Sequence, residues 1–383
     1  MGYTDPTSSR DLLGNRTLLF IFICAFAVVT LLQQILYGRN YLKSGLQFSW
    51  QSGEQMANWT GSLNFTDGGL LRNAGDPGSR YFEYYEGPFE YNSTKCLELR
   101  RDIIEVKVLS MSTLSRCCNA PAFLFTTQKN TPLGTKLKYE VDTSGIFHIN
   151  QEVFQMFPKE MPYYRSQFKK CAVVGNGGIL KNSRCGREID SADFVFRCNL
   201  PPISEKYIAD VGVKTDVVTV NPSIITERFH KLEKWRKPFF DVLQVYENAS
   251  VLLPAFYNTR NTDVSIRVRY VLDDFESQQA VYFFHPQYLI NVSRYWLNQG
   301  VRAKRISTGL ILVTAALELC EEVHLFGFWA FPMNPSGIFI THHYYDNVKP
   351  RPGFHAMPSE IFNFIHMHSR GILRVHTDAC NCC

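Results

Sequence analysis

The sequence has little excess charge of either sign. Its 383 residues include 40 Lys and Arg against 35 Asp and Glu, so the formal net charge at neutral pH is only +5. A nucleic-acid-binding domain usually concentrates basic residues in one patch, so we expect no nucleic-acid partner. Charged residues make up 20% and hydrophobic residues 45%. These fractions exclude a mostly disordered chain, because disorder requires low hydrophobicity and high net charge.

The motifs of several enzyme classes are also missing. No Gly-x-Ser-x-Gly segment supports a serine nucleophile. No His-Glu-x-x-His or His-x-x-x-His spacing supports a zinc site. The sequence has no Asp-x-Asp pair of the kind that binds a metal in many sugar-nucleotide transferases, and the adjacent Asp273 and Asp274 have the wrong spacing. We therefore expect no metal and no other cofactor, and keep a metal-dependent transferase as an alternative.

Only one apolar run is long enough to cross a bilayer. Residues 18–32 are apolar apart from Thr30, and residues 17–37 reach the required length as a helix. A cleaved signal peptide is the rival interpretation, but it needs small residues after the run, and the sequence continues with Leu, Gln, Ile and Tyr. We predict a tail at 1–16, a transmembrane signal-anchor at 17–37, a Gly- and Ser-containing stem at 38–80 and a globular domain at 81–383.

The orientation of this anchor follows from glycosylation sequons and cysteines. Basic residues are balanced around the run, so the positive-inside rule gives no answer. Ten of the eleven cysteines follow it, which suits an oxidising compartment. Most Asn-x-Ser/Thr sequons also follow it, and we predict a cytosolic tail and a luminal body, that is, a single-pass type II membrane protein. The predicted glycosylation sites are Asn58, Asn64, Asn92, Asn248 and Asn291.

Short apolar segments alternate with a helical pattern in the globular part. The segment Cys171-Ala-Val-Val-Gly-Asn-Gly-Gly predicts a strand that ends at Gly175 and a glycine turn of the kind that holds nucleotide phosphates. An ordinary structural turn is the alternative, because the Gly-x-Gly-x-x-Gly fingerprint is incomplete. A buried helix is predicted over 310–321, with Ser307 or Thr308 as its N-cap. Further strands are predicted at 194–196, 217–220, 251–254, 280–284 and 323–326, so we expect a layered α/β/α, Rossmann-like parallel sheet.

Half of the ten histidines fall between His342 and His368. The usual pKa of histidine lies near neutral pH, so His355 is a candidate general base, and Glu360 is a candidate to orient it. A histidine with a purely structural hydrogen bond is the simpler alternative. His366 and His368 alternate as on a strand or turn, without a cysteine pair at metal-binding spacing.

Four segments together resemble the motifs of the animal sialyltransferases, in the order of that family. Residues 171–220 resemble the large sialyl motif and residues 306–328 the small one. His342-His343-Tyr344-Tyr345-Asp346 resembles motif III, and His355 to Glu360 resembles the very small motif. The similarity is strongest to the alpha-2,8-sialyltransferase group. It implies a GT-A-like variant of the α/β fold and a catalytic role for residues 81–383.

The resemblance also implies a reaction and a set of site residues. The donor would be CMP-sialic acid, the acceptor a terminal sialic acid, and the displacement inverting and independent of metal. His355 would be the base, and His343 would stabilise the departing phosphate. The implied disulfides join Cys171 to Cys320 and Cys185 to a C-terminal cysteine, with Cys380 preferred over Cys382 and Cys383. The implied donor-binding residues are Asn176, Asn199, Ser307, Thr308, Gly309 and Trp329, with Gly175, Tyr344 and Glu360 in support.

The acceptor class is predicted from a scarcity of charge. Polysialylating relatives carry strongly basic stretches, whereas residues 281–305 hold only four basic side chains. We therefore expect a Golgi enzyme that makes short additions to glycolipid acceptors, the gangliosides. The alternatives are oligo- or polysialylation of glycoprotein N-glycans and a catalytically inactive glycan-binding homologue. The sequence leaves open whether the protein is a homodimer.

Overall fold

The computed structural model describes residues 107, 109–142, 144–349 and 353–380. All of them belong to one compact unit, Pro77–Cys383. The predicted tail, signal-anchor and stem lie outside the described residues, as do the sequons at Asn58, Asn64 and Asn92. No helix in the described part of the chain is long and apolar enough to span a membrane.

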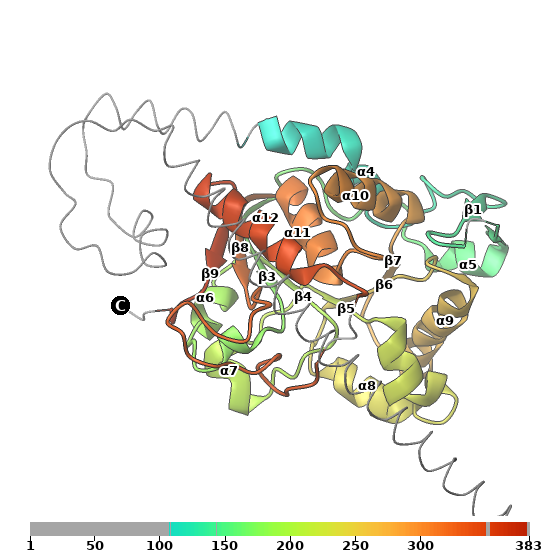
Figure 1. The fold of residues 1–383 in the computed structure, drawn as a ribbon. Coiled ribbons are helices and arrows are strands. Elements are labelled where there is room, and N and C mark those ends of the chain that lie inside the picture. Colours follow the sequence, from blue (N-terminus) through green and yellow to red (C-terminus); the bar gives the residue numbers. More distant parts are fainter. Residues whose placement is uncertain (1–106, 108, 143, 350–352, 381–383) are drawn as a thin grey trace, which may run out of the picture. The chain divides into compact units, whose positions relative to one another are not determined.

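A seven-stranded sheet forms the centre of the fold, and each neighbouring pair of its strands is parallel (Figure 1). Strands β4 to β7 are short, largely apolar and buried runs rather than alternating apolar and polar residues, as expected for parallel strands covered on both faces. Their order is β7-β6-β5-β4-β3-β8-β9. Their bounds are β3 Phe168–Val174, β4 Phe194–Arg197, β5 Val217–Thr219, β6 Ser250–Leu253, β7 Val281–Phe283, β8 Cys320–Phe326 and β9 Arg374–His376.

Two hydrophobic clusters cover the opposite faces of this sheet. In β3, Cys171 and Val173 belong to one cluster, whereas Ala172 and Val174 belong to the other. Successive side chains of a strand point to opposite faces, so the clusters are the two interfaces of a layered α/β/α fold. The predicted layered α/β/α core with a parallel sheet is confirmed.

Helices cover both faces. α11 and α12 lie side by side over β3 and β8 (Figure 1), and α8 and α9 contribute to the other cluster. Residues 109–117 are also helical, and short 3-10 or π turns occur at Gly178–Leu180, Ile224–Arg228 and His230–Leu232. The helix bounds are α4 Ala120–Phe123, α5 Gln151–Met156, α6 Gly186–Asp190, α7 Glu205–Val211, α8 Arg236–Gln244, α9 Thr259–Asp274, α10 Pro286–Asn298, α11 Thr308–Leu319 and α12 Met357–Ser369.

The strand order reverses between β3 and β8. From β3 the chain builds outward through β4, β5, β6 and β7, and then returns to place β8 and β9 on the other side of β3. In open parallel sheets, ligands bind at the carboxyl ends of the strands where the order reverses. The ends of β3 and β8 are therefore where a site is expected.

The helix α11 is buried almost all round. Its N-cap is Ser307, whose Oγ accepts a hydrogen bond from the N–H of Leu310 at 3.0 Å, so one of the two predicted caps is confirmed. The helix ends at Leu319 rather than at the predicted Glu321, because Cys320 is extended and pairs with Phe168 of β3. A small antiparallel hairpin, β1 Lys136–Lys138 and β2 Ile146–His148, was not predicted.

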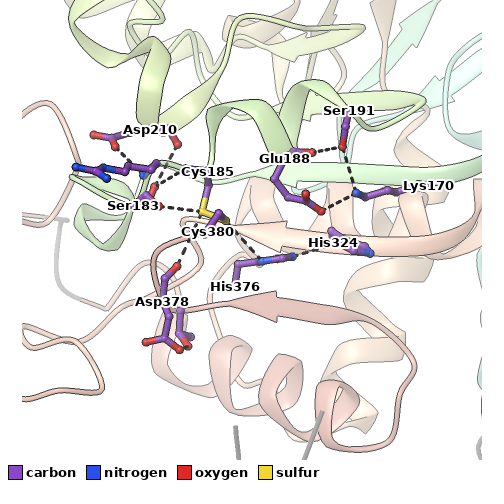
Figure 2. The surroundings of a disulfide bond; sticks show 12 residues. Lys170, Ser183, Cys185, Glu188, Ser191, Asp210, His324, His376, Asp378 and Cys380 are labelled. Atoms are coloured by element: carbon purple, nitrogen blue, oxygen red, sulfur yellow. Dashed lines mark hydrogen bonds and ion pairs between the residues drawn. A yellow bond between two sulfur atoms is a disulfide. The ribbon is translucent and has the colours of Figure 1, made fainter. Parts of the chain in front are cut away.

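Both disulfides implied by the resemblance are present. Cys171 pairs with Cys320, which joins β3 to the start of β8. Cys185 pairs with Cys380, which joins the N-terminus of α6 to the segment after β9 (Figure 2). Cys382 and Cys383 lie outside the described residues.

Candidate functional site

The glycine turn after β3 packs against two other loops. A Cβ on Gly177 would lie 2.5 Å from the carbonyl oxygen of Gly327, and a Cβ on Gly178 would clash with that of Thr341. Gly177 also forms an isolated antiparallel bridge with His343. These glycines are therefore required for close backbone packing. The turn brings the loop after β8 and the histidine loop to the end of β3.

Asn176 and Asn199 occupy the carboxyl ends of β3 and β4. Asn176 Nδ2 donates to the carbonyl of Cys198 at 2.9 Å, and its backbone oxygen accepts from the N–H of Tyr344 at 3.0 Å. The Oδ1 atom of Asn176 is buried and has no hydrogen-bond partner among the described residues. Asn199 has a φ of +63° and donates its N–H to Thr219 Oγ1 at 3.0 Å. An unpartnered buried acceptor at this strand end fits a role in ligand binding.

The N-terminus of α11 faces the same region. Thr308 Oγ1 donates to Asn221 Oδ1 at 3.2 Å. A Cβ on Gly309 would lie 2.7 Å from the ring of Phe328, in the loop after β8. The start of α11 is thus packed against the carboxyl end of β8. Its backbone N–H groups and helix dipole favour an anionic ligand.

Glu360 holds Ser307 in place. The N–H of Ser307 donates to Glu360 Oε1 at 2.9 Å, and its hydroxyl donates to Oε2. Burial raises the pKa of Glu360, and the hydrogen bonds from Ser307 and the charge of His355 oppose this shift. The described hydrogen bonds of Glu360 go to Ser307, so its predicted role in orienting His355 stays a prediction. Because α12 begins at Met357, the carboxylate lies one turn inside the helix and reaches the start of α11.

The backbone carbonyl of Arg305 is a hydrogen-bond partner of His355. His355 Nδ1 lies 2.8 Å from the carbonyl oxygen of Arg305. A carbonyl can only accept, so Nδ1 carries the proton and the neutral ring leaves Nε2 with a free lone pair. The N–H of Arg305 also donates to the carbonyl of Phe354 at 3.3 Å. This arrangement gives His355 the tautomer of a proton acceptor.

His343 has a charged partner instead. Its Nδ1 lies 2.7 Å from Asp346 Oδ1, and its ring stacks on Tyr345 at a centroid distance of 5.1 Å. Burial alone would raise the pKa of Asp346, but hydrogen bonds from His343 and from the N–H of Val348 lower it overall. A carboxylate at Nδ1 balances a positive charge on the ring and leaves Nε2–H as a donor. Asp346 lies in the segment that resembles motif III, but it had no predicted role of its own.

Two aromatic residues support the loops. Tyr344 is buried, its hydroxyl donates to the carbonyl of Pro202 at 2.7 Å, and burial raises its pKa. Trp329 Nε1 donates to the carbonyl of Met333 at 2.6 Å. Trp329 lies three residues after the end of β8, and its backbone oxygen lies next to Gly177 in the turn after β3.

Several candidates lie away from this cluster. His366 and His368 are on the helix α12, so the predicted strand or turn is wrong there. Asn248 is exposed in the turn after α8, whereas Asn291 is half-buried in α10 with Oδ1 accepting from Gln287. Among the described residues, no group of three or more His, Cys, Asp or Glu side chains is arranged to hold a metal ion.

Comparisons with known proteins agree with the motifs. The model of glycosyltransferase family 29 (sialyltransferase) matches residues 125–372. Alpha-2,8-sialyltransferase 8E of Homo sapiens is 76% identical and that of Mus musculus 73%, each aligned over all of both chains. The alpha-N-acetylneuraminide alpha-2,8-sialyltransferase of Xenopus laevis is 49% identical over 70% of this chain and 74% of its own. A solved mammalian sialyltransferase is 24% identical, with a TM-score of 0.46 over 70% of this chain and 95% of its own.

Proposed function

Because the chain belongs to glycosyltransferase family 29, the sialyltransferases, we propose that it transfers sialic acid from CMP-sialic acid to the terminal sialic acid of gangliosides in alpha-2,8 linkage. The alpha-2,8-sialyltransferase activity rests on the full-length identity to the human and mouse enzymes. The ganglioside acceptor, the inverting mechanism, the lack of a metal requirement and the residue roles are the proposal.

The observation that carries the mechanism is the difference between the partners of the two histidines. His355 donates Nδ1–H to a neutral carbonyl, which leaves Nε2 to accept a proton. His343 donates Nδ1–H to the carboxylate of Asp346, which suits a positive ring. One ring is therefore arranged as a base and the other as a donor to an anion.

The reaction uses these two roles together. The acceptor hydroxyl attacks the anomeric carbon of the donor, and His355 Nε2 takes the hydroxyl proton. The bond from that carbon to the phosphate oxygen breaks, and CMP leaves with the electron pair. A protonated His343 and the N–H groups at the start of α11 stabilise the negative charge on the phosphate. Attack opposite the leaving group inverts the anomeric centre.

The direct test uses the full-length protein in detergent, with CMP-sialic acid, chelator and a set of sialylated acceptors. We expect one or a few sialic acids to be added to gangliosides, and a His355→Ala variant to lose about 100-fold to 10,000-fold of the rate. The matched control is His366→Ala, because His366 is an exposed histidine on α12. Loss of activity in chelator would contradict the metal-free mechanism. Long chains on glycoproteins would contradict the acceptor class.

An exposed apolar loop supports a lipid-linked acceptor. Residues 328–340 contain no charged residue and lie between β8 and His343. Phe331, Met333, Ile338 and Phe339 are exposed by 39–74%. The loop is closed by a bridge between Met333 and Phe339, so these side chains are held at its surface. The hydrocarbon chains of a glycolipid acceptor, which lie next to its sugar, would cover these four exposed side chains.

The lipid contact is tested by Phe339→Ser. We expect the KM for a ganglioside in vesicles to rise about 5-fold to 10-fold, because burial of one large aromatic side chain contributes on the order of 1–2 kcal/mol. The KM for the free oligosaccharide of the same ganglioside stays unchanged. Val245→Ser is the control, since Val245 is an exposed apolar residue elsewhere. Equal changes for both acceptors would remove the lipid contact from the proposal.

The predicted signal-anchor leads us to propose a Golgi location with the catalytic domain in the lumen. Glycan attached to Asn248, which is exposed, would support a luminal body. Protease protection of residues 81–383 in sealed vesicles is expected. Digestion of that domain from the cytosolic side would contradict the orientation.

A further inference from the structure

Arg305 forms a buried ion pair outside all four motif segments. Its Nη2 lies 3.2 Å from Glu140 Oε2, and the two side chains are only 13% and 7% exposed. Its guanidinium carbon lies 3.9 Å from the ring centroid of Tyr257. Glu140 lies 165 positions before Arg305 in the sequence, and Tyr257 lies 48 positions before it. A planar guanidinium held by a carboxylate and an aromatic face has little freedom to move.

The backbone of the same residue holds His355. Its carbonyl accepts Nδ1–H of His355, and its N–H donates to the carbonyl of Phe354. These two bonds attach both the ring of His355 and the backbone before it to position 305. A shift of the Arg305 side chain would move the carbonyl that sets the His355 tautomer.

Glu140 is itself fixed. Its N–H donates to the carbonyl of Phe256 at 2.9 Å, and the N–H of Val141 donates to the carbonyl of Tyr257 at 3.2 Å. These bonds fasten the segment after β1 to the segment after β6. Burial raises the pKa of Glu140, and the charge and hydrogen bond of Arg305 oppose the shift. The backbone at Glu140 is therefore held in place, and its carboxylate stays next to the guanidinium of Arg305.

Two other roles for Arg305 fit the structure less well. A site for the acceptor carboxylate would need an available cation, but Glu140 already neutralises this one, and Nε is buried without a hydrogen-bond partner among the described residues. A role in stability alone is also poorly supported, because a buried ion pair often adds no more stability than apolar residues of similar size. The contact of Arg305 with the segment that carries His355 points to a role in positioning His355 rather than in stabilising the fold.

We propose that the side chains of Glu140 and Arg305 are positioning residues that hold His355 in the orientation and tautomer of a base. This inference rests on the proposed function of His355. Without Glu140, the Arg305 carbonyl no longer stays aligned with Nδ1, so a fraction of the rings carries the proton on Nε2 and cannot accept another. The carbonyl also stabilises the protonated ring, so its loss moves the acid limb of the rate profile to lower pH.

The experiment measures kcat, KM and the pH profile of kcat/KM for Glu140→Gln in the full-length protein. We expect kcat to fall at least 10-fold, the KM for CMP-sialic acid to stay within about 2-fold, and the acid limb to move to lower pH. Glu360 on α12 also interacts with His355 through its charge, but it is the same in every variant. The control is Glu233→Gln, which removes the charge of one of the two acidic partners of Arg267 in an exposed ion pair and leaves all three quantities unchanged.

A second variant protects the test against misfolding. Glu140→Gln leaves an unpaired buried cation, whereas the double variant Glu140→Gln with Arg305→Gln leaves none. We expect the double variant to recover thermal stability and still show the low kcat. A wild-type kcat in either folded variant would overturn the inference, and so would a fall in kcat with an unchanged pH profile.

A double-mutant cycle with His355→Ala separates this inference from the proposed function. If Glu140 acts through His355, adding Glu140→Gln to His355→Ala leaves the residual rate unchanged. Additive losses would overturn the positioning role while the base remained supported. Full activity in His355→Ala itself would overturn the proposed base and this inference with it.

Discussion

Two pairs of histidines in this molecule have opposite chemistry. His324 on β8 and His376 on β9 face each other, with His324 Nδ1 3.1 Å from His376 Nε2 (Figure 2). Burial, aided by neighbouring positive groups, lowers the pKa of His324 to about 4 and that of His376 to about 2. His343 and His355 are half-buried, and each holds its Nδ1 against an oxygen.

The comparison shows that partner and burial, rather than residue type, decide what a histidine can do. Within the pair His324 and His376, which we call the edge pair because β9 is the last strand of the sheet, one ring donates a hydrogen bond to the other, so both stay neutral. In the other pair, His343 and His355, which we call the switch-point pair, an oxygen accepts a hydrogen bond from Nδ1–H and leaves Nε2 for substrate. The carbonyl of Arg305 makes one ring a base, and the carboxylate of Asp346 makes the other suited to a positive charge.

After His355, the largest expected effect is at His343. His343→Ala removes the donor to the departing phosphate, so we expect kcat to fall about 100-fold to 1,000-fold. Asp346→Asn keeps a hydrogen-bond acceptor but loses the charge, so we expect a smaller fall, of about 10-fold to 100-fold. Steady-state kinetics with a ganglioside acceptor measure both.

The edge pair supplies the control for this prediction. His324→Asn and His376→Phe should each keep kcat within about 2-fold, because neither ring contacts His343 or His355 among the described residues. If either variant lost as much rate as His343→Ala, the two pairs would not differ in function, and the comparison would fail.

The next effect is on stability and concerns the disulfide beside the edge pair. Cys380 Sγ lies 4.0 Å from His376 Nδ1, and its bond to Cys185 joins segments 195 residues apart. Cys185→Ser with Cys380→Ser should lower the free energy of unfolding by about 2–5 kcal/mol. At a temperature where the variant is folded, kcat should remain near the wild-type value. Chemical unfolding with an activity assay tests both. A large loss of kcat in the folded variant would link this region to the chemistry.

The sequence predicts the sheet and the location of the site well. Strands β4 to β7 are short, largely apolar runs bounded by turns, and the N-cap Ser307 is a local signal, so neither depends on distant contacts. The edge strand β9, Arg374–His376, has one apolar residue and was not predicted. The glycines after β3 were also recognised, although the structure gives them a different reason. Gly177 and Gly178 admit neighbouring backbones that come from other loops.

The parts that could not be predicted depend on contacts between distant residues. His355 meets a carbonyl 50 positions earlier, and Glu360 meets Ser307 53 positions earlier. A backbone carbonyl leaves no trace in a sequence pattern, so the partner of His355 had no signal. Asp346 did have one, since it lies three residues after His343, but spacing alone does not show that the two side chains meet. His376 stands alone in the sequence, and only the pairing of β8 with β9 brings it to His324.

The smallest expected effect sharpens the comparison through pH. His324 and His376 are neutral in the folded protein well below the usual pKa of histidine, whereas in the unfolded chain they take up protons near pH 6.5. Between about pH 6.5 and 4 the unfolded state therefore binds more protons, and stability falls with falling pH by about 1.4 kcal/mol per unit for each histidine. His376→Phe, which keeps a ring stacked on Phe326, should remove at least one histidine's share of this slope. Unfolding in denaturant at a series of pH values measures the slope, with His148→Asn as the control because His148 is exposed on β2. An unchanged slope would mean that the edge pair already takes up protons when folded, and the contrast with the switch-point pair would then rest on hydrogen-bond partners alone.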